Sequence, residues 1–207
     1  CHDREFMNRI CSAILEIDQK VTAALRSDSM PKKEFGAPLA GNLLPWIDRE
    51  VEDGLRRVCE PLGIDLSVLW QWSAAAPGVI VPTHAYCADE GLRPTDPMRQ
   101  DQYPWSIEQV LAGRLITASS IEDLPAEAAV DRDTCRRFGI QSALCIPLSV
   151  GGEPPVGALG FNTLRAQRDW PDSLVKRLQL VAQVFTNALV RRRHELSLQE
   201  SEARLRA

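Results

Sequence analysis

Apolar residues recur along this chain with two different spacings, and the changes of spacing mark the expected elements. Over residues 1–26 they repeat every three or four positions, which is the period of one face of an amphipathic helix. The same period returns with Val51, Leu55 and Val58 and ends near Pro61. Residues 27–42 lie between these stretches and are rich in Pro, Gly and Ser, so we expect a linker or irregular segment there.

Strand patterns follow the second helix. Residues 65–72 alternate, with Val68, Trp70 and Trp72 on one side and Leu69 on the other, and residues 79–86 predict the antiparallel return. Pro82 in this second strand indicates a bulge or an edge position. Residues 87–103 predict a long loop, and loops of this length in compact domains are often functional.

Short helices and a hairpin are predicted in the second half of the chain. A short helix near residue 104, a strand at 114–118 and a helix at 126–138 come first, and Gly139 is well placed to end the last of these. The runs 142–150 and 156–164 are apolar on both faces, so we expect two strands at the centre of the sheet. A long helix with heptad-like spacing follows, with Leu174, Leu178, Val181, Phe185 and Ala188 on its seam.

These elements together predict an α+β sandwich. The sheet should be antiparallel with about five or six strands, and the first and last helices should lie together on one face. At 207 residues, the chain is long enough for one domain with helical extensions.

Composition narrows the possible partners and compartments. The net charge is −4 and no basic face dominates, which argues against nucleic acid as a partner. No apolar run approaches the roughly 20 residues that span a bilayer, so we expect a cytoplasmic location without direct membrane contact. The six cysteines form no CxxC pair, which favours a reducing compartment. The three histidines have no ligand-like spacing, so no metal site is predicted.

Three segments carry a family resemblance. They are WIDREVEDGLRRVCEPLGIDLSVLWQW, AVDRDTCRRFGIQSALCIPLSVGGEPPVGALGF and NTLRAQRDWPDSLVKRLQLVAQVFTNAL. Together they resemble a GAF domain over residues 43–192, in particular the sensory GAF domains of bacterial sensor histidine kinases that also carry PAS domains. The resemblance implies a GAF-like sandwich in which short helices and loops cover a ligand pocket on the face opposite the terminal helices.

The end of the chain is similar to the start of a PAS domain. Residues 198–206 read LQESEARLR, and the helix pattern reaches Ala207 without a glycine or proline. We therefore expect residues 193–207 to begin a signalling helix toward a downstream PAS or kinase region. No catalytic motif lies in this chain, so any kinase activity would belong to that region.

This sequence matches the known ligand-binding signatures of the family only in part. Aligned on Phe138, Ile140 and Pro147, the bilin attachment position falls on Val130, and Cys135 lies five residues later, which argues against covalent bilin. Cyclic-nucleotide-binding members carry an Asn-Lys-Phe-Asp-Glu signature whose Lys and Glu are missing here.

Two further chemistries involve single residues. Cys87 follows the second strand and is the one candidate for a redox-active thiol, as in the methionine sulfoxide reductases of the family. His84 could ligate haem, but a lone histidine on a strand is more often a packed residue, which argues against haem. The cofactor is therefore left unassigned.

The expected pocket lies between the sheet and residues 88–138. Ligand pockets are mostly apolar with a few placed polar groups, so a small, partly apolar molecule is the expected occupant. The alternative is that the aromatic residues of this region are ordinary core, which is the usual place of aromatic residues in strands. The candidate pocket residues are Trp70, Trp72, His84, Tyr86, Asp101, Trp105, Arg114, Phe138 and Phe161.

The sequence thus predicts a sensory module that passes a ligand state through its last helix. The seam continues with a spacing of seven through Leu189, Leu196 and Ala203, which favours a homodimer through the terminal helices. One alternative is a ligand-free dimerisation spacer. A second alternative is a thiol-based redox sensor or reductase.

Overall fold

The computed structural model describes residues 43–73, 75–76, 78–94 and 96–206, together with the isolated helical positions Ser12 and Gln19. The predicted helix over residues 1–26 and the linker over 27–42 otherwise lie outside the described residues. The described helices are α2 (Leu43–Leu62), α3 (Pro104–Leu111), α4 (Ala129–Arg137) and α5 (Asp172–Arg206). The strands are β1 (Leu66–Trp72), β2 (Val79–Cys87), β3 (Met98–Arg99), β4 (Ile116–Ala118), β5 (Ser142–Leu148) and β6 (Gly157–Thr163).

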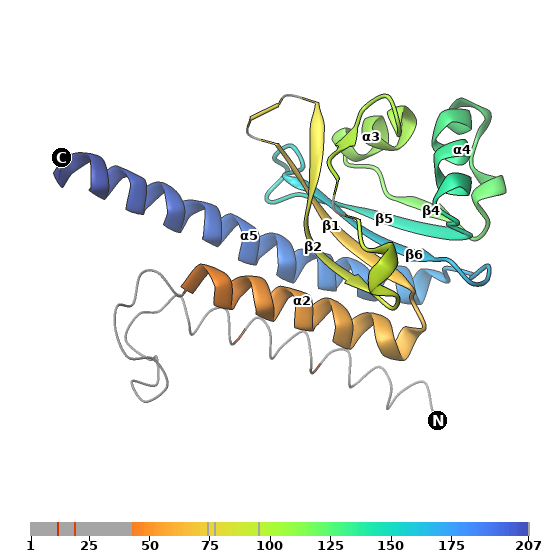
Figure 1. The fold of residues 1–207 in the computed structure, drawn as a ribbon, viewed down its shortest axis with the longest axis horizontal. Helices are drawn as coiled ribbons and strands as arrows, with labels where there is room; N and C mark the ends of the chain where they lie inside the picture. Colours follow the sequence, from red (N-terminus) through yellow and green to blue (C-terminus); the bar gives the residue numbers. More distant parts are fainter. Residues whose placement is uncertain are drawn as a thin grey trace.

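A single antiparallel sheet organises the molecule, and Figure 1 shows it between two groups of helices. Its strand order is β3-β2-β1-β6-β5-β4, so the prediction of an antiparallel sheet of five or six strands is confirmed. The central strands are β1 and β6. The expectation that both strands of the late hairpin are central holds for β6, whereas β5 has only the short edge strand β4 outside it.

Several predicted bounds are corrected by local chemistry. The hairpin strands stop at Leu148 and restart at Gly157, because two prolines lie in the turn and cannot donate ladder hydrogen bonds. Gly151 and Gly152 have φ values of 59° and 82°, which suits glycine. The predicted loop at 87–103 is not wholly irregular, since it contains the 3-10 turn Glu90–Leu92 and strand β3.

One face of the sheet packs against α2 and α5, and we call it the helix face (Figure 1). Phe161, Leu144 and Leu159 of the sheet are fully buried there. Leu55 of α2 and Phe185 of α5 meet them in the same core. Most of the apolar area that stabilises the fold is removed from water in this layer.

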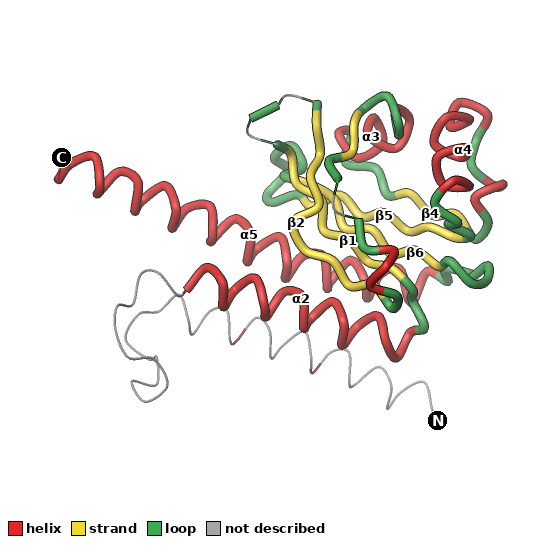
Figure 2. Tube along the Cα trace, viewed as in Figure 1, coloured by secondary structure: helices red, strands yellow, loops and turns green. Residues whose placement is uncertain are grey.

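The opposite face, which we call the distal face, is covered by α3 and α4 (Figure 2). Both covering helices end at a glycine with positive φ, Gly113 after α3 and Gly139 after α4. After α4 the amide of Gly139 donates to Arg136 O at 3.1 Å and that of Ile140 donates to Cys135 O at 2.9 Å. This paired pattern is a Schellman motif, so the predicted end of the helix at Gly139 is confirmed.

Among the described residues, we find no helix that combines the length and apolar character needed to cross a bilayer.

Candidate functional site

The distal face is built from alternate residues of five strands. In β1 these are Leu66, Val68 and Trp70, and residues paired directly across an antiparallel ladder share a face. Their partners on β6 are Asn162, Gly160 and Ala158. The register continues to β5, where these three residues lie opposite Ala143, Cys145 and Pro147.

Two separate hydrophobic clusters lie on this face instead of one core. The first, beside β2, contains Leu66, Val68, Ala85 and Cys87 with half-buried Trp70 against it. The second, beside β4 and α4, contains Ile116, Ala118, Ile121, Leu124, Ala128, Cys135 and Ile140. Leu164 packs against both clusters at one end of the sheet. Half-buried Cys145 of β5 also packs against the second cluster, so the residues of β6 are the ones that lie between the two clusters.

Small and polar residues occupy this middle strip. Gly160 is buried, and a Cβ placed on it would lie 3.9 Å from the Trp70 indole nitrogen and 3.7 Å from the Asn162 amide nitrogen. Asn162 and Cys145 are only half-buried. We refer to Trp70, Cys145, Gly160 and Asn162 as the distal strip. An indole N–H, a side-chain amide and a low backbone floor give it an apolar surface with a few placed polar groups, as small-molecule sites have.

The cover over the second cluster is anchored by a buried carboxylate. Asp131 of α4 is fully buried, and its two oxygens accept from the backbone N–H groups of Trp105 at 3.2 Å and Ser106 at 2.7 Å. These are free donors in the first turn of α3, so Asp131 caps that helix from a different element. Thr134 adds a second tie by donating to Gln102 O at 2.9 Å.

Three of the nine predicted site residues lie on the distal face or its cover. Trp70 belongs to the distal strip. Trp105 is half-buried against the second cluster, and Tyr103 beside it has its pKa raised by burial. Trp72 shares the strand face of Trp70, but its indole N–H donates to Pro155 O at 2.7 Å and holds the β5–β6 turn.

Three others lie on the helix face, where they cannot line a pocket on the distal face. Phe161 is fully buried against α2 and α5, and Tyr86 packs against the same core. His84 is 3% exposed, and its Nε2 lies 3.0 Å from Asp48 Oδ1 of α2. A shift of register between Leu69 and Trp70 leaves Thr83 as the extra residue, and His84 then pairs with Leu69 on the helix face. The bulge beside Pro82 is as the sequence predicts.

The remaining three predicted site residues lie at the surface. The carboxylate of Asp101 is 3.4 Å from Arg99 Nε, and both side chains are exposed. Arg114 donates from Nε to Gln109 Oε1 at 2.7 Å. Phe138 is 61% exposed, because it is the residue before Gly139 at the very end of α4. The nine residues therefore do not form one site.

The exit loop, residues 164–170, connects this face to α5. Trp170 Nε1 donates to Ala118 O of β4 at 3.2 Å, and the amide of Arg168 donates to Ser142 Oγ of β5 at 2.7 Å. On the other side, Asp65 accepts from the Leu164 amide at 2.8 Å. The loop is thus hydrogen-bonded to β4, to β5 and to the residue that precedes β1.

Comparison with known families decides the classification of this fold. The sequence profile of the GAF domain matches residues 47–189, which is more than half of the chain. The chain belongs to the GAF domain family. The predicted resemblance is therefore confirmed at the level of the family.

Solved structures support the same fold. The GAF domain resembles a domain of a protein described as a two-component sensor histidine kinase from Sinorhizobium meliloti 1021, with 15% identity, a TM-score of 0.58, and 77% of this chain and 99% of that chain covered. A phycoerythrobilin-bound GAF domain from a cyanobacterial phytochrome is 12% identical, with a TM-score of 0.62 and coverage of 88% and 97%. The GAF domain region of a Geobacter sulfurreducens PCA protein is 19% identical, with a TM-score of 0.59 and coverage of 72% and 95%.

The thiols of Cys87 and Cys135 have raised pKa values, unlike the thiol of a reactive cysteine. Cys87 is buried and donates to Asp89 O at 2.8 Å, and burial raises its pKa. Burial raises the pKa of Cys135 to about 12. Reactive thiolates need a lowered pKa. The cysteines described by the structure are free thiols, and no cluster of three or more metal-binding side chains is found within the same ranges.

Sequence reasoning did not select the distal-strip residues Cys145, Gly160 and Asn162, nor Asp131. The signal for the first three was present in the alternation of β5 and β6, but both runs are so apolar that neither face stands out. Asp131 could have been noticed as a lone acidic residue on the inward face of a short helix.

Proposed function

We propose that this GAF domain is the sensory module of a bacterial signal-transduction protein, and that it binds a small, partly apolar molecule over the distal strip. The supporting observation is the division of the distal face into two hydrophobic clusters, with half-buried Trp70 against the first, half-buried Cys145 against the second, and Gly160 and Asn162 of β6 between them. Removal of apolar surface from water stabilises a complex. An apolar ligand covering the strip would join the two clusters.

The exit loop supplies a route from the ligand to the output helix. A ligand can bias a protein only through its different affinity for two arrangements. Movement of β4 or β5 would act directly on Trp170 and Arg168, since both are hydrogen-bonded to these strands. Those residues immediately precede α5, which continues to Arg206 and has a length of about 50 Å.

The kinase context and the dimer are parts of the same proposal. The parent protein would be a cytoplasmic two-component sensor histidine kinase, with α5 leading to PAS or kinase domains and the phosphorelay beyond this chain. The fold of the Sinorhizobium meliloti domain is consistent with this context. Two copies would pair through α5, on which Leu180 is 60% exposed. The side chains of Leu196 and Ala203, which would continue the seam, lie outside the described residues.

A ligand screen with a blocking variant tests the proposal. Purified protein is examined by native mass spectrometry for a retained molecule and by thermal shift against a metabolite panel. Cys145→Phe should fill the distal strip and abolish the shift produced by any hit, whereas Leu205→Phe on the exposed end of α5 should leave it unchanged. A hit that survives Cys145→Phe unaltered would bind elsewhere, and the proposal for this strip would be wrong.

The spacer alternative is favoured by one observation, the 35-residue length of α5. A spacer needs a continuous helix and no ligand. A dimer in solution scattering, together with no retained molecule and no thermal shift, would identify a spacer. A strictly monomeric profile at high concentration would contradict both the spacer and the dimeric sensor.

A further inference from the structure

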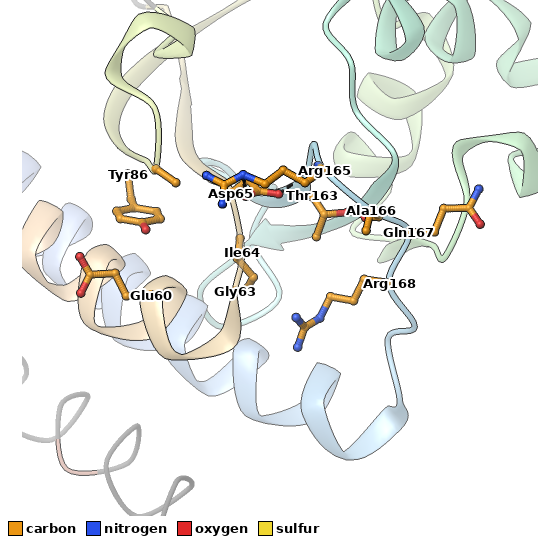
Figure 3. Close-up of a pocket in the computed structure, with 11 residues that line it drawn as sticks. Glu60, Gly63, Ile64, Asp65, Tyr86, Thr163, Arg165, Ala166, Gln167 and Arg168 are labelled. Carbon is orange, nitrogen blue, oxygen red and sulfur yellow. Dashed lines mark hydrogen bonds and ion pairs between the residues drawn. The ribbon is translucent and has the colours of Figure 1, made fainter.

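A cleft lies at the ends of the central strands, where α2 leads into β1 and the exit loop leaves β6. Its volume is about 370 Å³, which is within the range of small-ligand sites. It is separate from the distal strip, because its wall includes Tyr86, which packs on the helix face. Figure 3 shows Asp65 and Arg165 near the Gly63–Ile64 segment, with Arg168 on one side and Tyr86 on the other.

Small residues line the bottom of this cleft and leave space for a ligand. Gly63 has φ 63° and ends α2, with its amide donating to Glu60 O at 3.1 Å, so a larger residue would be strained there. A Cβ on Gly63 would contact nothing within 4 Å, which leaves open space above it. Ala88 and Ala166 line the same space.

Two arginines with different degrees of charge compensation border the cleft. Arg165 has its Nε 3.2 Å from Asp65 Oδ1, and 74% of its side chain is exposed, so its outer nitrogens can reach a second group. The Asp65 carboxylate is already committed, since it also accepts from the amides of Leu164 and Arg165. This ion pair leaves little net charge on that side of the cleft.

Arg168 is the uncompensated cation. Its guanidinium donates to Leu62 O, the last carbonyl of α2, and lies over the Trp170 ring at 5.6 Å. Its Nε is buried without a hydrogen-bond partner among the described residues, and no carboxylate within those ranges pairs with it. Burial lowers the pKa of Arg168. A half-buried guanidinium without a counter-charge is stabilised when an anion arrives, because charge-assisted hydrogen bonds to carboxylate or phosphate are strong.

We propose that this cleft binds a small carboxylate or phosphate anion through Arg168 and Arg165. The phenol of Tyr86 and the backbone at Gly63 form the opposite wall. Glu60 also lines the cleft, and its negative charge restricts the site to a compact anion held on the arginine side. The occupant would touch both the end of α2 and the loop that leads into α5. This proposal does not require a ligand on the distal strip, because the cleft is lined by none of the distal-strip residues.

Nuclear magnetic resonance titration of the isotopically labelled chain with inorganic phosphate, and separately with malonate, tests this proposal. Ionic strength is held constant with chloride. The amides of Gly63, Ala88 and Ala166 should shift and saturate in the millimolar range with at least one of the two anions, and the anion that binds more tightly distinguishes the two chemistries. If neither anion shifts these amides beyond the chloride control, the proposal is overturned.

Variants assign the effect to the arginines. Arg165→Gln leaves the Leu62 contact intact and should weaken binding several-fold, and Arg168→Lys should weaken it by about tenfold because a bidentate fork becomes a point charge. Arg204→Gln removes one positive charge at the far end of α5 and is the matched control. Equal affinity in all three folded variants would contradict the proposal even if the wild-type amides shift, because binding would then not depend on the arginines. Thermal unfolding confirms that each variant is folded.

Discussion

Asp131 Oδ1 lies 2.7 Å from the backbone nitrogen of Ser106, so a residue of α4 caps the start of α3. The capping carboxylate is fully buried, and its second oxygen takes the Trp105 amide. The residue preceding α3 is Tyr103, which provides no side-chain cap of its own. The two helices that cover the distal face are thereby fixed to each other.

Removing this cap should destabilise the domain. Asp131→Ala leaves the part-buried amides of Trp105 and Ser106 without their acceptor, and we expect a loss of about 1–3 kcal/mol in the free energy of unfolding. Urea denaturation followed by circular dichroism measures it. Asp133→Ala is the control on the same helix, since Asp133 is exposed and pairs only with exposed Arg136. Equal losses for both variants would show that burial of the cap is not what matters.

Alanine substitutions of two glycines in β6 should differ strongly in their effect on stability. A Cβ on Gly157 would lie 2.0 Å from the backbone oxygen of Trp70, and a central strand cannot move away from it. Gly157→Ala should therefore destabilise by about 3 kcal/mol or more. Gly160→Ala meets only ordinary contacts at 3.7 Å and beyond, and should change stability by less than about 1 kcal/mol. Thermal and urea unfolding of the pair measure the difference.

Substitutions on the two faces of the sheet should have different effects. A substitution on the helix face should mainly lower stability, and one on the distal face should mainly weaken ligand binding. Phe161→Ala removes a fully buried side chain from the main core and should cost about 3–5 kcal/mol. Trp70→Ala removes a half-buried side chain of the distal strip and should abolish the thermal shift caused by a distal-face ligand, with a smaller loss of stability. If Phe161→Ala weakens ligand binding as much as Trp70→Ala in folded protein, the assignment of faces is wrong.

The ion pair between the turn at Ile121–Asp123 and α4 should depend on pH. Arg136 donates to Glu122 at 2.6 Å and 3.0 Å, and this contact lowers the pKa of Glu122. A carboxyl whose pKa is lowered in the folded state stabilises the fold above its unfolded pKa of about 4.3, and this contribution disappears as pH falls through the folded pKa. Wild type should thus exceed Glu122→Gln in stability at neutral pH and equal it in acid.

Urea unfolding across a pH series measures this difference. The effect should be small, because both partners are about half exposed. Glu127→Gln, on the neighbouring exposed turn, should show no such convergence. A gap between wild type and Glu122→Gln that persists at the lowest pH at which both remain folded would refute the assignment to this ion pair.

The buried thiols should be slow to react. Burial raises the pKa of both Cys87 and Cys135, so little thiolate exists near neutral pH. Alkylation of the native protein by iodoacetamide, followed by peptide mass spectrometry, should label both far more slowly than in urea. Rapid labelling of Cys87 in native protein would support the redox alternative instead.

Local sequence patterns were sufficient for most elements of the fold. The apolar period of α2, the alternation in β1, the bulge signalled by Pro82 and the glycine after α4 each depend on a few neighbouring residues. The order β3-β2-β1-β6-β5-β4 was not predicted, because the pairing of β1 with β6 joins segments that are far apart in the sequence. The strands of the late hairpin were predicted too long, because their apolar runs extend into the turn.

The positions of the candidate site residues could not be predicted from local sequence patterns. Periodicity and turn chemistry are local, so the sequence by itself determined the element types and the α+β class. The resemblance of three sequence segments to a known family indicated the GAF domain. Only the tertiary structure decided that His84 and Phe161 face the helices, that Phe138 lies at the surface and that Gly160 and Asn162 form the distal strip. A one-residue bulge reverses the face of every residue beyond it, and a capping contact such as Asp131 to Ser106 joins residues of different elements. Both effects arise from the pairing of segments in space.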